Sequence, residues 1–395
     1  IHKRSILTYR TPFRRYGCSG VMALSFLYSL AVQSTHAASL DIKALYNYDQ
    51  YSNFSISPNG KYLAIGDNRN ENASRALIVD LDTMQPEKVI GLGDTPVNSV
   101  RWATNNRLLV SLRLKTNVRL PWNYRYIDSD GESHRSLLDV GYSRMVAMDR
   151  DGSNFVPMMA GAKGSLRQNT RLDRITSILP DDPNHVLMPA ENDGVNLYKV
   201  NIFDGSFEKI EDGRYNTYDY TVTRSGYPIA RYDYASRGKY VKISVRADNE
   251  KKWSTLATVR IEDLDEFSPV GDTDKAGEIF VSARPEGEDR AAIYRYDLVN
   301  KAFLNKVASH PKVDINRVIT NTSGDYVASV FIDHQVTYEF ADLIIAANYK
   351  QLTQRLGPGV SVSIRQVSQD GKRWIVKAFG PQEPGGWGVY NTETQ

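Results

Sequence analysis

A short pattern recurs seven times in this chain of 395 residues. Each copy has a Gly or Asn at a predicted turn, one spacer residue and then three mostly apolar residues. Successive copies are separated by 46, 78, 42, 51, 47 and 47 residues. A period near 47 that combines short strands with tight turns is typical of a β-propeller, in which each repeat forms one blade. The seven anchor residues are Gly60, Asn106, Asn184, Gly226, Gly277, Gly324 and Gly371.

A second landmark lies 20 residues after the anchor in three of the repeats, at Asp80, Asp297 and Asn391. Each of these residues closes an apolar-rich segment and precedes a turn. The order of strand, Gly or Asn turn, strand, loop, strand, Asp turn and strand is an antiparallel meander. Short strands at regular spacing also suit β-sandwiches, but the constant internal spacing favours true repeats. The sequence therefore predicts an all-β fold, a seven-bladed β-propeller of four-stranded antiparallel blades.

The two ends of the chain carry different signals. Five basic residues precede the first acidic residue, Asp41, and an apolar stretch over 21–32 leads to the small residues Ala37 and Ala38. This layout predicts a secretory signal peptide over residues 1–37, although a buried first helix is the alternative. The apolar core is too short to span a bilayer, which takes roughly 20 residues. The predicted propeller then covers 38–395, and its last blade is expected to be truncated at Gln395.

Cleavage after Ala37 changes what the composition implies. It removes five positive charges, so the formal net charge falls from +3 to −2, and we expect no nucleic-acid partner and no stable membrane anchor. It also removes Cys18, the single cysteine. An exported chain without cysteine suits a bacterial periplasm, where free thiols are oxidised. We expect a periplasmic or secreted bacterial protein.

A search for catalytic motifs returns none. The serine-hydrolase elbow Gly-x-Ser-x-Gly is absent after the signal peptide, since the segment that starts at Gly141 lacks the last glycine. Phosphate-binding and dinucleotide-binding loops are also absent. The pair Asp333-His334 has no identifiable nucleophile beside it, and Asp149–Asn154 resembles a calcium loop without its distant Glu. The sequence predicts no catalytic residue, no metal site and no cofactor.

Two groups of residues are candidates for contact with a substrate. The step of 78 residues holds an insertion that contains Trp122, Tyr124 and Tyr126. These aromatic residues would either line a substrate entrance or pack the insertion onto its blade. Glu286 and Glu288 lie between two strands of the fifth repeat, where they would bind a peptide ammonium group; a solvated turn is the alternative.

The sixth repeat carries an additional helical segment. Residues 338–356 roughly follow a helical period, and Gly357-Pro358 ends it. We expect a short helix on the outside or on one rim of the ring.

Four segments resemble the prolyl oligopeptidase family of serine peptidases, in particular its bacterial branch akin to dipeptidyl and acylaminoacyl peptidases. They are residues 51–64, 148–154, 194–200 and 367–373. The resemblance implies a seven-bladed propeller that covers an α/β-hydrolase domain, excludes folded proteins and admits short peptides. The hydrolase domain, with its Ser-Asp-His triad, would follow Gln395 and is absent from this chain. No catalytic residue can be assigned from the family, and the paired Glu of the dipeptidyl peptidases is not recognisable.

We therefore expect a catalytically silent gating propeller of an exported serine peptidase. Its partners would be the C-terminal α/β-hydrolase domain of the same polypeptide and short peptide substrates. The alternatives are a stand-alone periplasmic binding or scaffold propeller and a propeller glycosidase, which would need two carboxylates across the central cavity.

Overall fold

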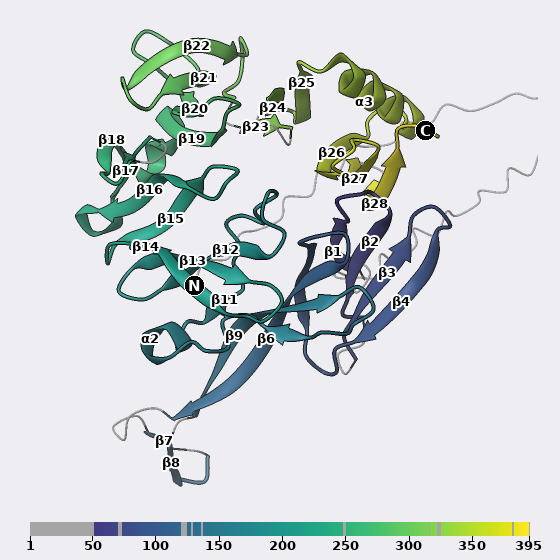
Figure 1. The fold of residues 1–395 in the computed structure, drawn as a ribbon, viewed down its shortest axis with the longest axis vertical. Coiled ribbons are helices and arrows are strands. Elements are labelled where there is room, and N and C mark those ends of the chain that lie inside the picture. The colour runs from purple at the N-terminus through teal and green to yellow at the C-terminus, as the bar shows by residue number, and fades with distance from the viewer. Residues whose placement is uncertain are drawn as a thin grey trace, which may run out of the picture. The chain divides into compact units, whose positions relative to one another are not determined.

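Seven small antiparallel sheets follow one another along the chain and are arranged in a ring (Figure 1). The computed structural model describes residues 51–69, 73–119, 125–127, 129–135, 137–247, 250–315, 317–321, 325–380 and 383–394. The ring confirms the predicted all-β, seven-bladed propeller. The predicted signal peptide, residues 1–37, lies outside the described residues.

Three blades are plain four-stranded meanders. Blade 1 contains β1 (Tyr51–Ile56), β2 (Tyr62–Asp67), β3 (Arg75–Asp80) and β4 (Gln85–Gly91). Blade 4 contains β15 (Thr217–Val222), β16 (Pro228–Ala235), β17 (Tyr240–Val245) and β18 (Ser254–Arg260), with the 3-10 turns η1 (Ser236–Gly238) and η2 (Ile261–Glu266). Blade 5 contains β19 (Phe267–Asp272), β20 (Glu278–Ala283), β21 (Ala292–Asp297) and β22 (Ala302–Ala308).

Blade 2 carries the insertion. Its main strands are β5 (Val97–Trp102), β6 (Arg107–Arg119), β9 (Leu137–Asp149) and β10 (Val156–Pro157). The short strand β11 (Arg171–Leu172) also pairs with β9, after the single-turn helix α2 (Gly164–Arg167). A separate two-stranded sheet is made by β7 (Arg125–Ile127) and β8 (Ser133–Arg135).

The other three sheets have three described strands each. Blade 3 contains β12 (His185–Glu191), β13 (Val195–Asn201) and β14 (Phe207–Glu211), and its inner strand is reduced to a bridge between Ser177 and Leu187. Blade 6 contains β23 (Arg317–Thr320), β24 (Tyr326–Asp333) and β25 (Gln335–Phe340), followed by α3 (Leu343–Leu356). Blade 7 contains β26 (Ser361–Val367), β27 (Arg373–Gly380) and β28 (Glu383–Asn391). Helix α3 confirms the predicted helix, although residues 338–340 belong to β25.

The recurring anchor marks the turn between the first and second strands of a blade. The second strand follows it within a few residues in each blade whose anchor is described; Gly324 lies outside the described residues. At Gly60, Gly226, Gly277 and Gly371 the backbone φ lies between 70° and 88°, a left-handed conformation that glycine adopts without a Cβ penalty. At Gly226 a Cβ would lie 2.5 Å from Leu179 Cδ2, so a larger residue would displace that buried side chain.

The second landmark residues form Asx turns. The Asp80 Oδ1 atom accepts hydrogen bonds from the backbone N–H groups of Asp82 and Thr83, at 2.8 and 3.0 Å. The Oδ1 atom of Asp297 accepts two equivalent bonds, both of 2.8 Å. These bonds lower the pKa of both carboxyl groups. The largest contribution comes from the Thr83 N–H group at Asp80 and from the Asn300 N–H group at Asp297. The 20-residue spacing is thus the length of a two-strand hairpin that ends in a side-chain-capped turn.

Seven buried apolar clusters hold the described residues together, one at each contact between neighbouring blades. The second strand of a blade contributes side chains to the clusters on both of its sides, because alternate side chains point to opposite faces of a strand. In β2, Ala64 belongs to the cluster shared with blade 2, and Leu63 belongs to the cluster shared with blade 7. Burial on both faces explains why three consecutive apolar residues follow the anchor, where a half-buried strand would alternate.

The contact between blades 7 and 1 closes the ring without strand exchange among the described residues. The Gln366 side chain accepts a hydrogen bond from Ile56 N–H at 3.0 Å and donates one to Ile56 C=O at 3.1 Å. The Gln369 N–H donates to Pro58 C=O at 2.8 Å. Arg373 and Asp82 form an ion pair of 2.5 Å. Polar groups therefore hold blades 7 and 1 together at this contact, where a shared strand would otherwise join them.

One further polar group joins blades 2 and 3, and another lies within blade 3. Arg107, which is 1% exposed, donates to Ile202 C=O of blade 3 at 3.0 and 2.6 Å and to the Asp149 carboxylate at 2.8 Å. In blade 3, burial raises the pKa of Asp182, but hydrogen bonds from Lys199 and His185 outweigh this effect and hold its pKa at about 2.

Candidate functional site: a pocket beside the blade 2 ribbon

Strands β6 and β9 form a long two-stranded ribbon that continues beyond the other strands of blade 2 (Figure 1). They pair in one unbroken register, from Arg107 opposite Asp149 to Arg119 opposite Leu137. Paired residues place their side chains on the same face of a sheet. Leu114 opposite Tyr142 and Thr116 opposite Val140 therefore share one face. The sequence alternates along the ribbon, so the other face is polar.

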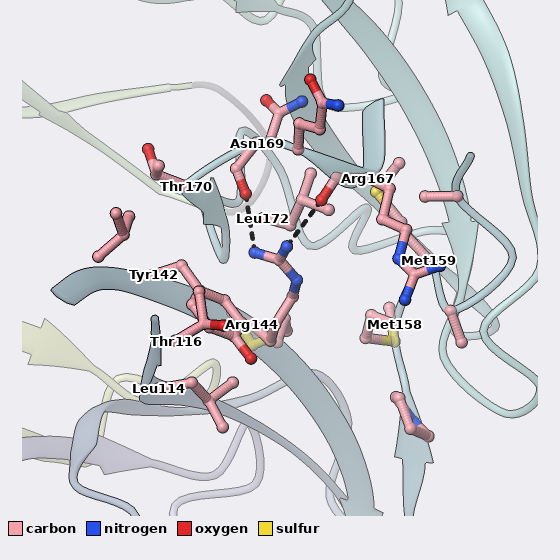
Figure 2. A pocket seen from close by; sticks show the side chains of 16 residues that line it. Leu114, Thr116, Tyr142, Arg144, Met158, Met159, Arg167, Asn169, Thr170 and Leu172 are labelled. Atoms are coloured by element: carbon pink, nitrogen blue, oxygen red, sulfur yellow. Dashed lines mark hydrogen bonds between the residues drawn. The ribbon is translucent and has the colours of Figure 1, made fainter. Parts of the chain in front are cut away.

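This less polar face lines a pocket of about 670 Å³. The opposite wall is formed by the segment that leaves β10, passes through α2 and enters β11 (Figure 2). The described lining is mostly apolar, with polar groups at the rim. It consists of Leu114, Thr116, Val140, Tyr142, Arg144, Met145, Pro157, Met158, Met159, Ala160, Ala162, Arg167, Gln168, Asn169, Thr170 and Leu172.

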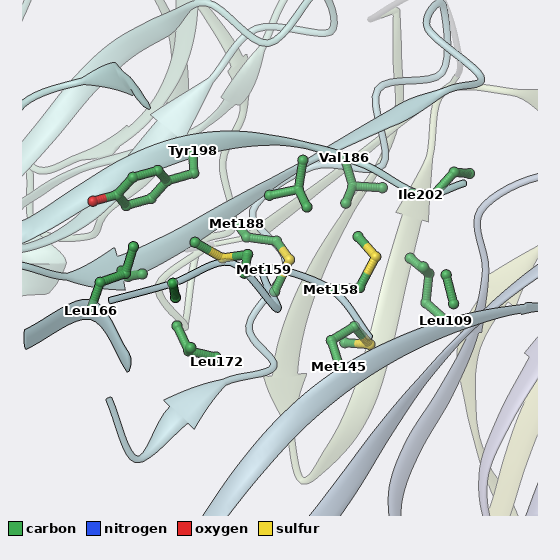
Figure 3. Packing of buried hydrophobic residues seen from close by; sticks show 14 residues of the cluster. Leu109, Met145, Met158, Met159, Leu166, Leu172, Val186, Met188, Tyr198 and Ile202 are labelled. Carbon is green, nitrogen blue, oxygen red and sulfur yellow. The ribbon is translucent and has the colours of Figure 1, made fainter. Parts of the chain in front are cut away.

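Methionines form the floor of the pocket. Met145, Met158 and Met159 are each 2% exposed and belong to the cluster between blades 2 and 3 (Figure 3). Their unbranched thioether side chains adapt to ligands of different shape. Met159 also has a φ of 55°, which costs an L residue about 1–2 kcal/mol. Its N–H donates to Gly205 C=O at 3.1 Å, which ties the strained residue to blade 3.

Arg144 fixes the opposite wall to the ribbon. Its guanidinium donates to Asn169 C=O at 2.9 Å and to Arg167 C=O at 2.9 Å, as the dashed lines in Figure 2 show. It also lies over the Tyr142 ring, 4.6 Å from the centroid. Burial lowers the pKa of Arg144, and the nearby Arg167 charge acts in the same direction. The Arg167 side chain is exposed and makes no hydrogen bond or ion pair with described residues. One rim of the pocket is therefore cationic.

The described lining combines apolar side chains with cationic and hydroxyl groups. None of the described lining residues is an acid, a histidine, a serine or a cysteine. Apolar walls fit an aliphatic or aromatic side chain, and the guanidinium groups fit an anion. In addition, the described residues contain no group of three or more His, Cys, Asp or Glu side chains arranged to hold a metal ion.

None of the sequence candidates that the structure describes lines this pocket. Trp122 and Tyr124 lie outside the described residues, and Tyr126 is paired with His134 in the β7–β8 sheet. Glu286 is exposed in the turn between β20 and β21. Glu288 forms an ion pair of 2.7 Å with Lys306. The structure thus places the two glutamates on a solvated turn of blade 5, away from the ribbon.

Two other motifs also have local structural roles. The His334 side chain is 98% exposed, and its Nε2 atom lies 3.6 Å from the Asp333 carboxylate. The two residues thus form an exposed pair. The Asp149 carboxylate accepts hydrogen bonds from Arg107 and from the Asn154 amide, at 2.8 and 2.7 Å, within a hairpin turn.

The methionine floor carries no periodic sequence signal. Met158 and Met159 lie in an irregular segment, and β10 before them is two residues long. The one signal that would have revealed the ribbon is the alternation of apolar and polar residues on both sides of the insertion.

Comparisons with known proteins identify no family. No protein-family model matches the chain, and no curated protein matches it. Among solved structures, it is similar to a chain in a structure described as the crystal structure of the mitotic checkpoint complex. The two chains share 11% identity with a TM-score of 0.39 over 86% of this chain and 87% of that chain. This similarity is too weak to bear on function. No helix in the described residues is long and apolar enough to cross a membrane.

Proposed function

We propose that this chain is the non-catalytic, substrate-selecting propeller of an exported serine peptidase that hydrolyses short peptides. The observation that carries the proposal is the resemblance of four segments to the prolyl oligopeptidase family. Residues 51–64 span β1, the following turn and the start of β2, and residues 367–373 span the corresponding turn of blade 7. Two of the four segments thus fall on matching turns of the ring.

The pocket beside the ribbon supports a selecting role. It offers an apolar volume of about 670 Å³ with a cationic rim, which suits one or two side chains of a peptide and not a folded protein. Its described lining has no group able to act as a nucleophile activated by a base. Binding and hydrolysis would therefore be divided between two domains.

In this proposal the chemistry is acyl transfer. A serine hydroxyl in a C-terminal α/β-hydrolase domain attacks the peptide carbonyl while a histidine accepts its proton. The histidine then gives this proton to the leaving amine as the C–N bond breaks, and water later hydrolyses the acyl-serine ester to a free carboxylate and the regenerated serine. The propeller determines which peptides reach that serine. Export to the periplasm or the medium follows from the predicted signal peptide over residues 1–37.

The reading frame after Gln395 tests the proposal. We expect a Gly-x-Ser-x-Gly motif within roughly 200–300 further residues, given the usual size of such a domain. A stop codon directly after Gln395 would contradict it. The longer protein should react with a fluorophosphonate probe at that serine, and the 395-residue chain should not react.

A stand-alone binding propeller is the second candidate. It is favoured by the same pocket, because a peptide-binding protein needs a pocket and no nucleophile. A stop codon after Gln395 together with measurable peptide binding would support this candidate. The two candidate functions therefore predict different reading frames after Gln395, but both predict peptide binding at the pocket.

A further inference from the structure

The outer edge of β9 loses its partner strands part of the way along the ribbon. The Met145 C=O accepts from Met158 N–H at 2.9 Å, and the Ser143 N–H donates to Thr170 C=O at 2.7 Å. These bonds show that odd-numbered residues of β9 direct their N–H and C=O groups to this edge. Because the register with β6 is unbroken to Leu137, the same holds for the rest of the strand. No described strand pairs with this edge before Ser143.

Gly141 lies in the middle of the unpaired stretch. A Cβ atom built there would have no atom within 4 Å. Glycine within a strand often marks a place where another backbone approaches closely. With the neighbouring edge residue Asp139, it offers two N–H and two C=O groups in the geometry that a further strand requires. An edge of this kind is a template for strand addition unless it is protected.

The pocket adjoins the same edge. Strand β11 runs parallel to β9 opposite Ser143 and Arg144, and the chain before it turns away through Thr170 into the pocket wall. Tyr142 and Arg144 of β9 and Thr170 and Leu172 at β11 all line the pocket, so the pocket lies against this part of β9. A strand added there would direct every second side chain to the face that carries Tyr142 and Val140, which is the face that lines the pocket.

Charge determines the direction of the added strand. Arg144 and Arg167 lie at the end of the pocket next to β11. A peptide parallel to β9 brings its C-terminal carboxylate to this end, whereas an antiparallel peptide brings its ammonium group there. Two guanidinium groups attract the first and repel the second.

We propose that an extended peptide with a free C-terminus binds as an added strand, parallel to β9, opposite Asp139 and Gly141. Alternate apolar side chains of the peptide enter the pocket on the face of Val140 and Tyr142, and its carboxylate meets Arg167. The role of this peptide as a substrate rests on the proposed function, but its binding does not.

Proline substitution on the ribbon tests the added strand. Gly141→Pro removes the N–H that faces the peptide and breaks no β6–β9 hydrogen bond. Lys115→Pro is the matched control, because Lys115 is paired with Gly141 and its N–H faces the opposite edge of the ribbon. The 395-residue chain and both variants are titrated against the fluorescein-labelled peptide Ser-Leu-Ser-Leu-Ser-Leu and followed by anisotropy.

We expect Gly141→Pro to weaken binding at least about tenfold, and Lys115→Pro to change it less than about twofold. Circular dichroism and thermal unfolding establish that both variants are folded. Equal affinity for the wild type and Gly141→Pro would overturn the proposal, as would a peptide that fails to bind the wild-type chain. Equal losses in both proline variants would also overturn it, since the effect would then not belong to one edge.

The C-terminus provides a second readout. Amidation of the peptide should weaken binding to the wild type about tenfold, since a charge-assisted hydrogen bond is lost. In Arg167→Gln the free and amidated peptides should bind equally. Persistence of the tenfold difference in Arg167→Gln would contradict the parallel orientation. If the longer protein has a hydrolase domain but no peptide binds at β9, this inference is refuted and the proposed function stands. If the peptide binds at β9 but the reading frame stops after Gln395, the inference stands and the proposed peptidase function is refuted.

Discussion

Replacement of Gln366 by alanine tests how the ring is closed. Gln366 joins blade 7 to Ile56 of blade 1 through two hydrogen bonds, and the two residues are 310 positions apart. Ile56 is 1% exposed, so both of its backbone groups would lose their partner in a nearly water-free position. Two neutral hydrogen bonds contribute about 1 kcal/mol each, and unsatisfied buried groups add to the cost. We expect Gln366→Ala to lower the free energy of unfolding by about 2–3 kcal/mol.

The corresponding change in melting temperature follows from the size of the ring. Unfolding entropy near 2.1 cal/mol/K per residue gives about 0.7 kcal/mol/K for the roughly 340 residues from β1 to β28. The expected decrease is therefore about 3–4 °C. Differential scanning calorimetry measures it, and hydrogen exchange shows whether Ile56 N–H becomes less protected.

Gln369→Ala is the matched control. Gln369 reaches blade 1 through its backbone N–H, and its side chain is exposed. The same substitution there should change the free energy of unfolding by less than about 0.5 kcal/mol. If Gln366→Ala melted like the wild type with unchanged protection of Ile56, closure by this side chain would be refuted.

Three further perturbations have defined outcomes. Arg107→Met removes a buried guanidinium between blades 2 and 3, and calorimetry should show a loss of about 3–5 kcal/mol; a loss below about 1 kcal/mol would contradict its role. Gly194→Ala should prevent folding, because its Cβ would lie 1.8 Å from Arg214 C=O, whereas Gly277→Ala has open space and should yield soluble protein with only the cost of a positive φ; similar yields would contradict the clash. Asp182 has a folded pKa of about 2, below its unfolded value, so its contribution is present above about pH 4 and is lost as the pH falls towards 2; urea unfolding should show Asp182→Asn losing on the order of 1 kcal/mol at pH 7, after allowance for solvent screening, and almost nothing at pH 2.

The ring could be predicted from the sequence because its repeating parts are local. A turn between two strands and an Asp at the end of the third each depend on a few neighbouring residues. The turn-forming roles of Gly60 and Asp80 can therefore be predicted from their neighbours in sequence, whatever the position of blade 1 in the ring. The number of blades follows by counting.

The contacts between blades could not be predicted in the same way. Gln366 and Arg107 act on groups 310 and 95 residues away, and a single sequence gives no sign of such partners. In the strand pattern, Arg107 resembles any exposed residue at the start of a hairpin, yet it is buried. Glu288 lies in a charged run that the sequence left open as a ligand hook or a solvated turn, and in the structure it pairs with Lys306 of the next hairpin.

The candidate site could not be predicted from the sequence for a related reason. The insertion drew interest through its aromatic residues, whereas the described pocket depends on the register of β6 with β9. Parity along that register decides which ribbon residues share the apolar face and which backbone groups face the unpaired edge. Met158 and Met159 enter the pocket from an irregular segment with no period to read.

Amide exchange along the ribbon, measured residue by residue with and without the peptide Ser-Leu-Ser-Leu-Ser-Leu, tests the central claim that this propeller binds extended peptides at one strand edge. The N–H groups of Asp139 and Gly141 face that edge, and those of Lys115 and Asn117 face the other edge of the same ribbon. We predict that the peptide slows exchange at Asp139 and Gly141 and leaves Lys115 and Asn117 unchanged. Unchanged exchange at Gly141 with bound peptide, or equal protection on both edges, would contradict the account.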